Sequence, residues 1–407
     1  MLKKIKEKAS SFLKRQNDFW RFFIFNYLST SRYSIVIIDD IYPLPLSAFR
    51  LTEFNYYLSY FSDSIIYTTG EAFKYLYINE NVNNIVRSHL HQYPEHNNRI
   101  IEFDPNRRLK AKLAYVIFLH NAYRFLPIIE KNSIPFVFTL YPGGGFLMNE
   151  ENTNKQLKRI FDSIFFRKVI VTQKITFDYL VQNNLCSQEK IELVYGVVMP
   201  IYELHHRTVE RTELKVNFDL CFVANKYMPL GVDKGYDTFI ALAKKLSSKY
   251  ADMKFHVVGT FDRNDINVDG YDNIIFYGSQ KTSFFPEFYS NMDIIVSPNV
   301  PFKLGNGAFD GFPTGGCVEA GLMGVALFCS DSIGQNIYFN HKEDIVIIKN
   351  DVDDICLSIE YYYHNYPELQ NLRVKGKNKL EALFNINTQM SPRIKVLTSI
   401  LNAQTII

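Results

Sequence analysis

One short stretch of the chain places two carboxylates around a pair of glycines. Asp310 precedes Gly315 and Gly316, and Glu319 follows shortly after them. Glycines at the start of a helix let backbone N–H groups approach an anion closely, and the helix dipole favours negative charge there. A phosphate or diphosphate fits such a site, with ribose hydroxyls on Glu319 and a sugar hydroxyl on Asp310. A glycine-rich turn before an ordinary helix has the same pattern, so both interpretations stay open.

Two further loops carry groups that suit the same kind of ligand. Lys226 follows an expected strand and Lys234 precedes an expected helix, so either amine could neutralise a departing diphosphate. Gly278 ends another expected strand, and the backbone from Ser279 to Lys281 could contact the edge of a base. Each of these signals is weak alone, because lysines and turns are common on protein surfaces.

The composition indicates a globular protein with more than one domain. The chain has 407 residues, of which 47% are hydrophobic and 21% charged, and two domains are the natural expectation at this length. A net charge of +3 is too small to indicate nucleic acid as a partner. The five cysteines form no C-x-x-C pair, their number is odd and no signal peptide is visible, so we expect a reducing cytoplasm.

The first residues have a basic bias that permits two interpretations. The stretch "MLKKIKEKASSFLKRQNDFWRFF" holds seven Lys or Arg residues against Glu7 and Asp18. It could form an interfacial helix on an anionic membrane, which would place the protein at the inner face of that membrane. It could equally form a helix that caps the first domain with a solvated basic face. No apolar stretch approaches the roughly 18–20 residues that a membrane span needs.

Short apolar runs alternate with helix-like stretches along most of the chain. The run 33–40 and later runs of similar length predict buried strands of parallel sheets covered on both faces. A polar stretch at 202–216 interrupts the alternation, which then restarts at 218–225. The prediction is an α/β fold of two doubly wound, Rossmann-like domains, 1–205 and 206–385, with a C-terminal helix in 386–407 that can pack back on the first domain. Ligands of such sheets bind beyond the carboxyl ends of the strands, here in the cleft between the domains.

The order of the motifs in the second half resembles the donor-binding half of family-four glycosyltransferases with the GT-B fold. The resemblance rests on "ANK", "DKG" before an amphipathic helix, "VVG", "FYGS", "DIIVSPN", "DGFPTGG", "VEAG" and "GVALFCSD", and it covers about 218–334. The first half matches more loosely, through its strands and "KVIVTQKITFDYL" at 168–180.

The resemblance implies a role for each matching residue. Glu319 looks like the second acid of the family's E-x7-E motif, which holds the nucleotide ribose, and Asp310 looks like the first, which contacts the donor sugar. Gly311 and Phe312 look like the Gly-Phe after that acid, and Gly315 and Gly316 fall where backbone amides meet the diphosphate. Lys234 looks like the family's phosphate lysine, and Lys226 lies in the region of its partner arginine. The chain departs from the motif in having Asp as the first acid and nine positions between the acids (319 − 310 = 9), where the family has eight.

The first domain should supply the acceptor side of the cleft. His120 is expected at a strand end with Arg124 in the turn after it, and Tyr141 at the next strand end, where family members often carry a histidine. His120 is therefore the candidate polar residue here, although a single histidine is more often structural. Gly143 and Gly144 could admit a sugar or phosphate close to the backbone. Arg50 could face the diphosphate from across the cleft.

The resemblance implies a retaining glycosyltransferase whose catalytic residues include Asp310, His120 and Lys234. Neither a D-x-D motif suited to a divalent ion nor a histidine cluster of that kind is found, so we expect no metal and no cofactor beyond the nucleotide-diphosphate sugar. A glycan or lipid-linked acceptor in bacterial surface polysaccharide synthesis would fit the basic N-terminus. The alternatives are a sugar-nucleotide epimerase or hydrolase, a phosphorylase, and a non-catalytic nucleotide-sugar-binding protein. A nicotinamide-dependent dehydrogenase is disfavoured, because no G-x-G-x-x-G follows the first strand.

Overall fold

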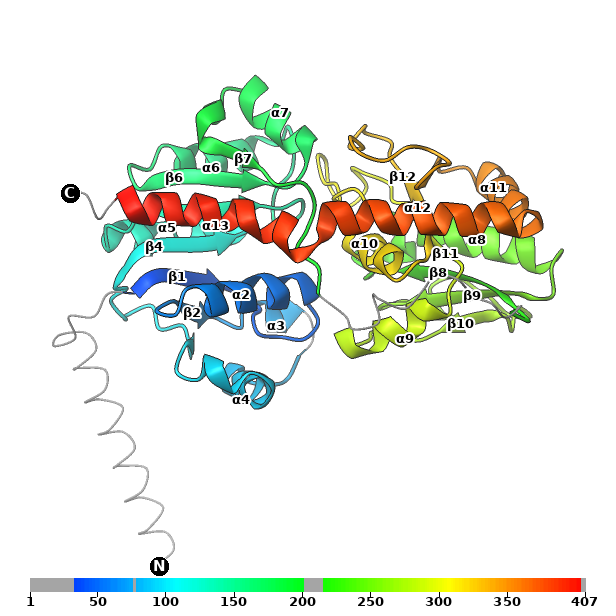
Figure 1. Ribbon diagram of the computed structural model, residues 1–407, viewed down its shortest axis with the longest axis horizontal. Coiled ribbons are helices and arrows are strands. Elements are labelled where there is room, and N and C mark those ends of the chain that lie inside the picture. Colours follow the sequence, from blue (N-terminus) through cyan, green and yellow to red (C-terminus); the bar gives the residue numbers. More distant parts are fainter. Residues whose placement is uncertain (1–32, 76–77, 201–214, 404–407) are drawn as a thin grey trace, which may run out of the picture.

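The computed structural model describes residues 33–75, 78–200 and 215–403 of the chain. Two sheets, each covered by helices on both faces, lie side by side and are joined by a long helical arm (Figure 1). The predicted doubly wound α/β architecture is confirmed. The predictions for the basic N-terminal segment and for most of the polar linker fall outside the described residues.

The first domain is built on a parallel sheet with the strand order β3-β2-β1-β4-β5-β6-β7. Its strands are short, and most of their residues are buried, which explains why they are near-continuous apolar runs rather than alternating ones. The strands are β1 (Tyr33–Asp39), β2 (Ile65–Thr68), β3 (Ile100–Glu102), β4 (Ala111–Ile117), β5 (Phe136–Leu140), β6 (Phe166–Val171) and β7 (Ile191–Leu193).

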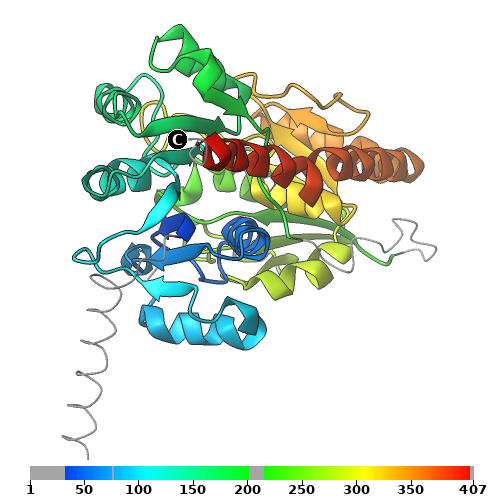
Figure 2. The same ribbon diagram turned by 60° about the vertical axis from the view of Figure 1, so that its left-hand side comes forward.

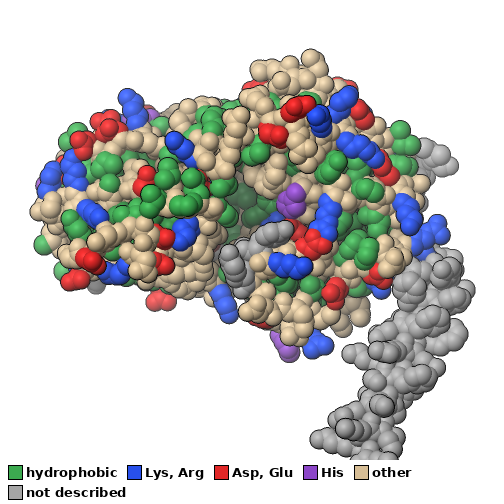
Figure 3. All heavy atoms as spheres, turned by 180° about the vertical axis from the view of Figure 1, so that it is seen from behind, with side chains coloured by type: hydrophobic (Ala, Val, Ile, Leu, Met, Phe, Trp, Pro, Cys, Tyr) green, Lys and Arg blue, Asp and Glu red, His purple; other side chains and the backbone are tan. Residues whose placement is uncertain are grey.

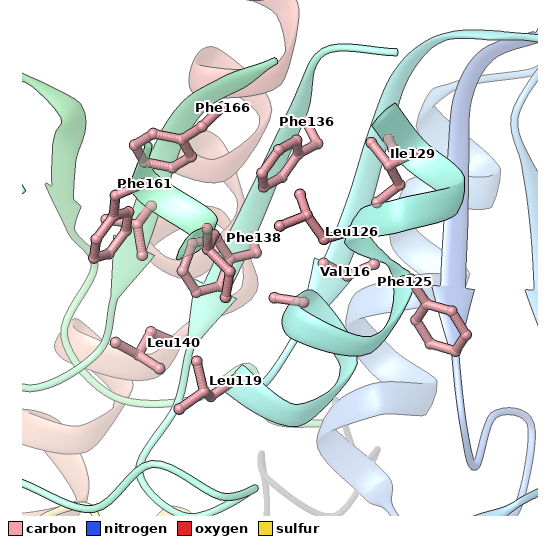
Figure 4. Packing of buried hydrophobic residues seen from close by; sticks show 14 of the residues in the cluster. Val116, Leu119, Phe125, Leu126, Ile129, Phe136, Phe138, Leu140, Phe161 and Phe166 are labelled. Atoms are coloured by element: carbon pink, nitrogen blue, oxygen red, sulfur yellow. The ribbon is translucent and has the colours of Figure 1, made fainter. Parts of the chain in front are cut away.

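Helices cover both faces of this sheet. One example is α5, whose apolar face carries Leu126 and Ile129 against Phe136 and Phe138 of β5 (Figure 4). His120, expected at a strand end, lies in the first turn of α5, and Arg124 lies further along the same helix, because β4 ends at Ile117. The helices of this domain are α2 (Ala48–Tyr60), α3 (Ala72–Tyr75), α4 (Val82–Gln92), η2 (Pro94–His96), α5 (Leu119–Lys131), α6 (Glu151–Phe161), α7 (Lys174–Gln182) and η3 (Gln188–Lys190).

The second domain repeats this plan with the strand order β10-β9-β8-β11-β12-β13, again all parallel. Its strands are β8 (Phe218–Val223), β9 (Met253–Val258), β10 (Ile274–Phe276), β11 (Ile294–Ser297), β12 (Ala326–Ser330) and β13 (Val346–Ile348). Its helices are η5 (Pro229–Gly231), α8 (Tyr236–Ser247), η6 (Thr282–Phe284), α9 (Phe285–Ser290), α10 (Gly315–Leu322) and α11 (Val352–His364).

The last two helices connect the domains. α12 (Tyr366–Phe384) packs beside α10 and β12 of the second domain, whereas α13 (Ile386–Ala403) lies against β4 and β6 of the first (Figures 1 and 2). Met390 and Leu397 of α13 are fully buried in the core of the first domain. None of the helices in the described part of the chain combines the length and apolarity needed to cross a membrane.

Both sheets reverse their winding direction at one point. In the first domain the reversal lies between β1 and β4, and in the second between β8 and β11. Loops that leave neighbouring strands in opposite directions open a crevice at that point, where doubly wound proteins bind their ligands. A ligand site is therefore expected among the residues that follow these four strands.

Candidate functional site

A cavity of about 390 Å³ lies between the two domains. The first domain lines it with Phe118, which follows β4, and with residues 142–147, which follow β5. The second domain contributes residues from the loops after β8, β11 and β12. Seen from behind, the surface is hollowed between the two halves, and hydrophobic side chains gather around the hollow (Figure 3). The cavity thus coincides with the crevices of both sheets.

The most prominent polar feature of the cavity is a contact between Lys234 and Asp310. The Lys234 Nζ lies 2.7 Å and 2.6 Å from the two carboxylate oxygens of Asp310. Asn299 donates a further hydrogen bond of 3.0 Å to this carboxylate, and the Gln335 side chain donates one of 3.0 Å to the Asp310 backbone carbonyl. The Tyr227 ring lies 5.1 Å from the Lys234 Nζ. An ammonium has three N–H donors, so one remains for a ligand while Asp310 is bound.

The N-terminus of α10 provides backbone donors beside this pair. Its N-cap residue Thr314 lines the cavity and makes no capping hydrogen bond through its side chain. The first N–H groups of a helix have no acceptor inside the helix, and the helix dipole adds partial positive charge there. A Cβ built on Gly315 would meet nothing within 4 Å, so the space in front of this residue is open. The geometry therefore suits a bound anion such as a diphosphate.

Sequence patterns did not indicate Asp233, Asn299 or Gln335, although all three line the cavity. Asp233 is only 5% exposed, and its Oδ2 lies 3.9 Å from the Lys234 Nζ. Burial raises the pKa of Asp233, and the nearby Asp310 acts in the same direction against the opposing charge of Lys234. The acid immediately before the lysine in "VDKG" is the one signal that could have indicated it.

On the first-domain side, His120 and Asp40 meet across the crevice between β1 and β4. The His120 Nε2 lies 3.0 Å from an oxygen of Asp40, and its Nδ1 lies 2.8 Å from the Gly144 carbonyl oxygen. Asp40 also accepts hydrogen bonds from Asn121 at 3.1 Å and from Arg50 at 3.3 Å. Both nitrogens of His120 therefore face acceptors, an arrangement that a doubly protonated imidazolium satisfies.

The titration properties of this pair agree with its geometry. Burial acts to lower the pKa of His120, but the hydrogen bond and charge of Asp40 and the Gly144 carbonyl outweigh burial and raise it. Burial likewise acts to raise the pKa of Asp40, but the His120 hydrogen bond and the Arg50 charge outweigh it and lower the pKa to about 2. Asp40 and the Gly144 carbonyl therefore favour the charged form of His120, whose Nδ1 contacts the glycine loop after β5.

Arg50 and Tyr141, both predicted on the acceptor side, lie behind the cavity wall. Arg50 is buried between Asp39 and Asp40, and its guanidinium carbon lies 4.8 Å from the centre of the Phe118 ring. The Tyr141 hydroxyl donates a hydrogen bond of 2.9 Å to the buried Glu53. Neither residue is part of the cavity lining. Arg50 pairs with the two aspartates, and Tyr141 packs in the core and binds Glu53.

Several of the predicted donor-binding residues also lie outside this cavity lining: Glu319, Lys226, Gly278, Ser279, Lys281, Gly315 and Gly316. Glu319 is 7% exposed and lies in the second half of the short helix α10. The Lys226 Nζ is bound to Asp265 at 2.6 Å.

The cavity brings together the predicted residues Lys234, Asp310, Gly311, Phe312, Gly143 and Gly144. Phe312 itself is buried, and its carbonyl oxygen accepts a hydrogen bond of 2.6 Å from the Tyr195 hydroxyl. Within the residues that the structure describes, no three His, Cys, Asp or Glu side chains are grouped so that they could hold a metal ion.

Comparison with known proteins supports the resemblance. Residues 227–379 match the family described as Glycosyl transferases group 1. No curated protein matches the sequence closely enough to count as a relative.

Solved structures of similar shape cover nearly the whole chain. HepE from Anabaena in complex with UDP is 14% identical with a TM-score of 0.65, covering 90% of this chain and 100% of its own. Sucrose-phosphate synthase from Thermosynechococcus elongatus is 12% identical with a TM-score of 0.62, covering 91% of this chain and 100% of its own. A glycosyltransferase from Rickettsia africae is 14% identical with a TM-score of 0.60, covering 91% of this chain and 99% of its own. The predicted GT-B fold and the family resemblance of the second domain are thereby confirmed.

Proposed function

We propose that this protein transfers a sugar from a nucleotide-diphosphate sugar to an acceptor hydroxyl. The observation that carries the proposal is the cavity between the domains, which is lined by Lys234, Asp310 and Thr314, the N-cap residue of α10. These groups offer one ammonium, one carboxylate and several backbone N–H groups, which match a diphosphate joined to a polyhydroxylated ring. The match to a glycosyltransferase family and the UDP complex of HepE support this choice of ligand.

In the proposed reaction the bond between the anomeric carbon and the β-phosphate oxygen breaks through an oxocarbenium-like state. Negative charge grows on the departing diphosphate, so the remaining N–H of Lys234 and the amides of Gly315 and Gly316 stabilise that state more than the ground state. Asp310 holds a donor-sugar hydroxyl. The family resemblance assigns the ribose to Glu319, which is 7% exposed and lies outside the cavity lining. The family resemblance favours retention of configuration, with the departing phosphate oxygen taking the proton of the acceptor hydroxyl.

His120 has a positioning role in this proposal rather than that of a base. A general base needs a free lone pair, and both ring nitrogens of His120 face acceptors. Its Nδ1 contacts the Gly144 carbonyl oxygen, which keeps the glycine loop in place for the acceptor.

We further propose a glycan or lipid-linked acceptor, metal-independent transfer and a place in bacterial surface polysaccharide synthesis, with the protein at the inner face of the membrane. The basic bias of the first 23 residues is the observation that favours an anionic membrane surface. Flotation with vesicles of mixed zwitterionic and anionic phospholipid, with and without residues 1–22, tests the membrane contact. Equal partitioning of both forms would remove it.

The test of the activity begins with a panel of nucleotide sugars and measures protection against thermal unfolding. Lys234→Ala and Glu319→Ala should fold and lose most of the protection given by any ligand that the parent binds. Lys245→Ala, on the exposed side of α8, is the matched control and should keep it. Release of free UDP or another nucleotide only when an acceptor is added distinguishes a transferase from a hydrolase. Full protection of both site variants would show that the site is misplaced.

A further inference from the structure

A loop of the second domain crosses the cleft and contacts the first domain. This cleft-crossing loop, residues 298–314, connects β11 to α10. The Met148 N–H of the first domain donates a hydrogen bond of 3.0 Å to the Gly307 carbonyl. Gly307 has a φ of 81°, and a Cβ there would overlap the Met148 carbonyl oxygen, so only glycine allows the two backbones to approach this closely. The contact is therefore built into the sequence of the loop.

Phe309 of this loop belongs to the core of the other domain. It is 5% exposed and packs within the hydrophobic cluster formed by β4, β5, β6 and α5 of the first domain. Its ring centre lies 5.9 Å from that of Phe146 at an interplanar angle of 72°, an edge-to-face contact. Burial of a phenylalanine side chain contributes on the order of 2 kcal/mol, so this ring is a strong anchor for a single loop residue.

The next residue, Asp310, lies between two segments that contact residues of the first half of the chain. Phe309 anchors it on one side. On the other side, the Phe312 carbonyl accepts hydrogen bonds from Tyr195 at 2.6 Å and from Gln173 at 3.4 Å, and both donors belong to the first half of the chain. Between these anchors, the Asp310 carboxylate reaches back to Lys234 of its own domain. The position of this carboxylate thus depends on contacts with the opposite domain as well as on Asn299 and Gln335 of its own domain.

We infer that Phe309 is a positioning residue. Its packing in the first domain holds the Asp310 carboxylate against the Lys234 ammonium. When the loop packs against the first domain, it closes the cleft on this side and places the Asp310 carboxylate at the same time. The inference rests on the proposed function only for its consequence in catalysis, because the placement itself can be measured in the protein without any ligand.

The measurement is the rate at which acetic anhydride acetylates Lys234, followed by mass spectrometry, with Lys244 of α8 as the internal reference. Ion pairing lowers the reactivity of an amine, so Asp310→Asn defines the rate of an unpaired Lys234. Phe309→Ala should raise the relative rate about fivefold, approaching that of Asp310→Asn. Phe302→Ala is the matched control, because Phe302 lies on the same loop but is 44% exposed, and it should leave the rate unchanged.

Two further variants cover the case in which Phe309→Ala does not fold. Phe309→Leu keeps an apolar anchor and should restore most of the parental rate, while Phe146→Leu loosens the seat from the other domain and should raise the rate. A folded Phe309→Ala protein with the parental Lys234 rate would overturn the inference, as would equal effects of Phe309→Ala and Phe302→Ala.

Once a donor is known, Phe309→Ala should lower kcat about tenfold or more while changing the KM for the donor by less than about threefold, since Asp310 acts on the reacting sugar. If no nucleotide sugar binds, the proposed function fails but the acetylation result still decides the position of Asp310. If a donor binds and the acetylation rates do not differ, the inference about Phe309 fails alone.

Discussion

The Nε2 atom of His120 lies 3.0 Å from the Oδ2 atom of Asp40. The two residues are 80 positions apart, and the parallel pairing of β1 with β4 is what brings them together. Since the Gly144 carbonyl occupies the other ring nitrogen, the charge state of His120 depends on this carboxylate.

Asp40→Asn should therefore lower the pKa of His120 by about 1 unit or more, because the neutral amide no longer favours the cation. Because the pKa of His120 is raised in the folded protein, its protonation stabilises the fold. This contribution to the free energy of unfolding is complete below the pKa of the unfolded chain, near 6.5, and is lost as the pH rises through the pKa of the folded protein. An NMR titration of the His120 ring protons measures the shift. Asp104→Asn, at an exposed turn of the same domain, is the control and should not move this pKa. An unchanged His120 titration in Asp40→Asn would contradict the pairing.

The two lysines that the sequence suggested for the diphosphate differ in their surroundings. Lys234 lines the cavity, whereas Lys226 is bound to Asp265 and is not part of the lining. Lys234→Met should weaken UDP binding about tenfold to a hundredfold, since it removes a charge-assisted donor and leaves Asp310 and Asp233 near an anion. Lys226→Met should change UDP binding by less than about threefold. Isothermal titration calorimetry measures both, and a larger loss for Lys226→Met would reverse the assignment.

The sequence predicted the two sheets because each strand is a short apolar run and the stretches between the strands have the spacing of apolar residues that is typical of helices. It also indicated the loops of the site, since Asp310, Lys234, Gly143 and Gly144 all follow strands or precede helices at the carboxyl edges of the sheets. A position in a loop does not determine the direction of a side chain. Tyr141 comes directly after β5, but its hydroxyl reaches the buried Glu53 instead of the cavity.

Pairings between distant residues were the part that sequence patterns could not supply. Nothing in the sequence around Asp40 indicates its distant partners. It contacts His120 and Asn121 only because β1 and β4 lie side by side. In the same way, the sequence around Phe309 does not show that this residue packs in the core of the opposite domain and not in that of its own. Such contacts depend on how the two domains face each other, which no local period encodes.

Acid should destabilise the first domain through His89. This residue is 7% exposed on α4, where its Nε2 lies 3.2 Å from the Tyr42 hydroxyl and 3.3 Å from a ring nitrogen of His96. Burial, with a smaller contribution from His96, lowers the pKa of His89 to about 4. The unfolded chain binds a proton near pH 6.5, so the free energy of unfolding should fall as the pH drops from about 6.5 to 4, by on the order of 2 kcal/mol.

His89→Gln should reduce this loss, because glutamine keeps a polar partner for Tyr42 and does not titrate. Urea unfolding at pH 7.5 and pH 5 measures the difference. His91→Gln, at an exposed position of the same helix, should retain the parental pH dependence. An equal loss of stability on acidification in the parent and in His89→Gln would exclude His89 as its source.

The C-terminal helix should depend on one fully buried ion pair. Arg393 of α13 and Glu53 of α2 are both 0% exposed, with the Arg393 Nε 3.9 Å from a carboxylate oxygen of Glu53. The same carboxylate accepts hydrogen bonds from three tyrosine hydroxyls: those of Tyr57, Tyr115 and Tyr141. Arg393→Met keeps the volume of the side chain but leaves this carboxylate without its cation.

The expected cost of Arg393→Met is about 3–5 kcal/mol in the free energy of unfolding of the first domain, the usual penalty for an uncompensated buried charge. Lys395→Met, on the exposed side of α13, should cost less than about 0.5 kcal/mol. The double variant Glu53→Gln with Arg393→Met should recover part of the loss, because it removes the stranded charge. Urea unfolding followed by circular dichroism measures all three variants. If Arg393→Met is as stable as Lys395→Met, the buried pair does not hold α13 on the first domain.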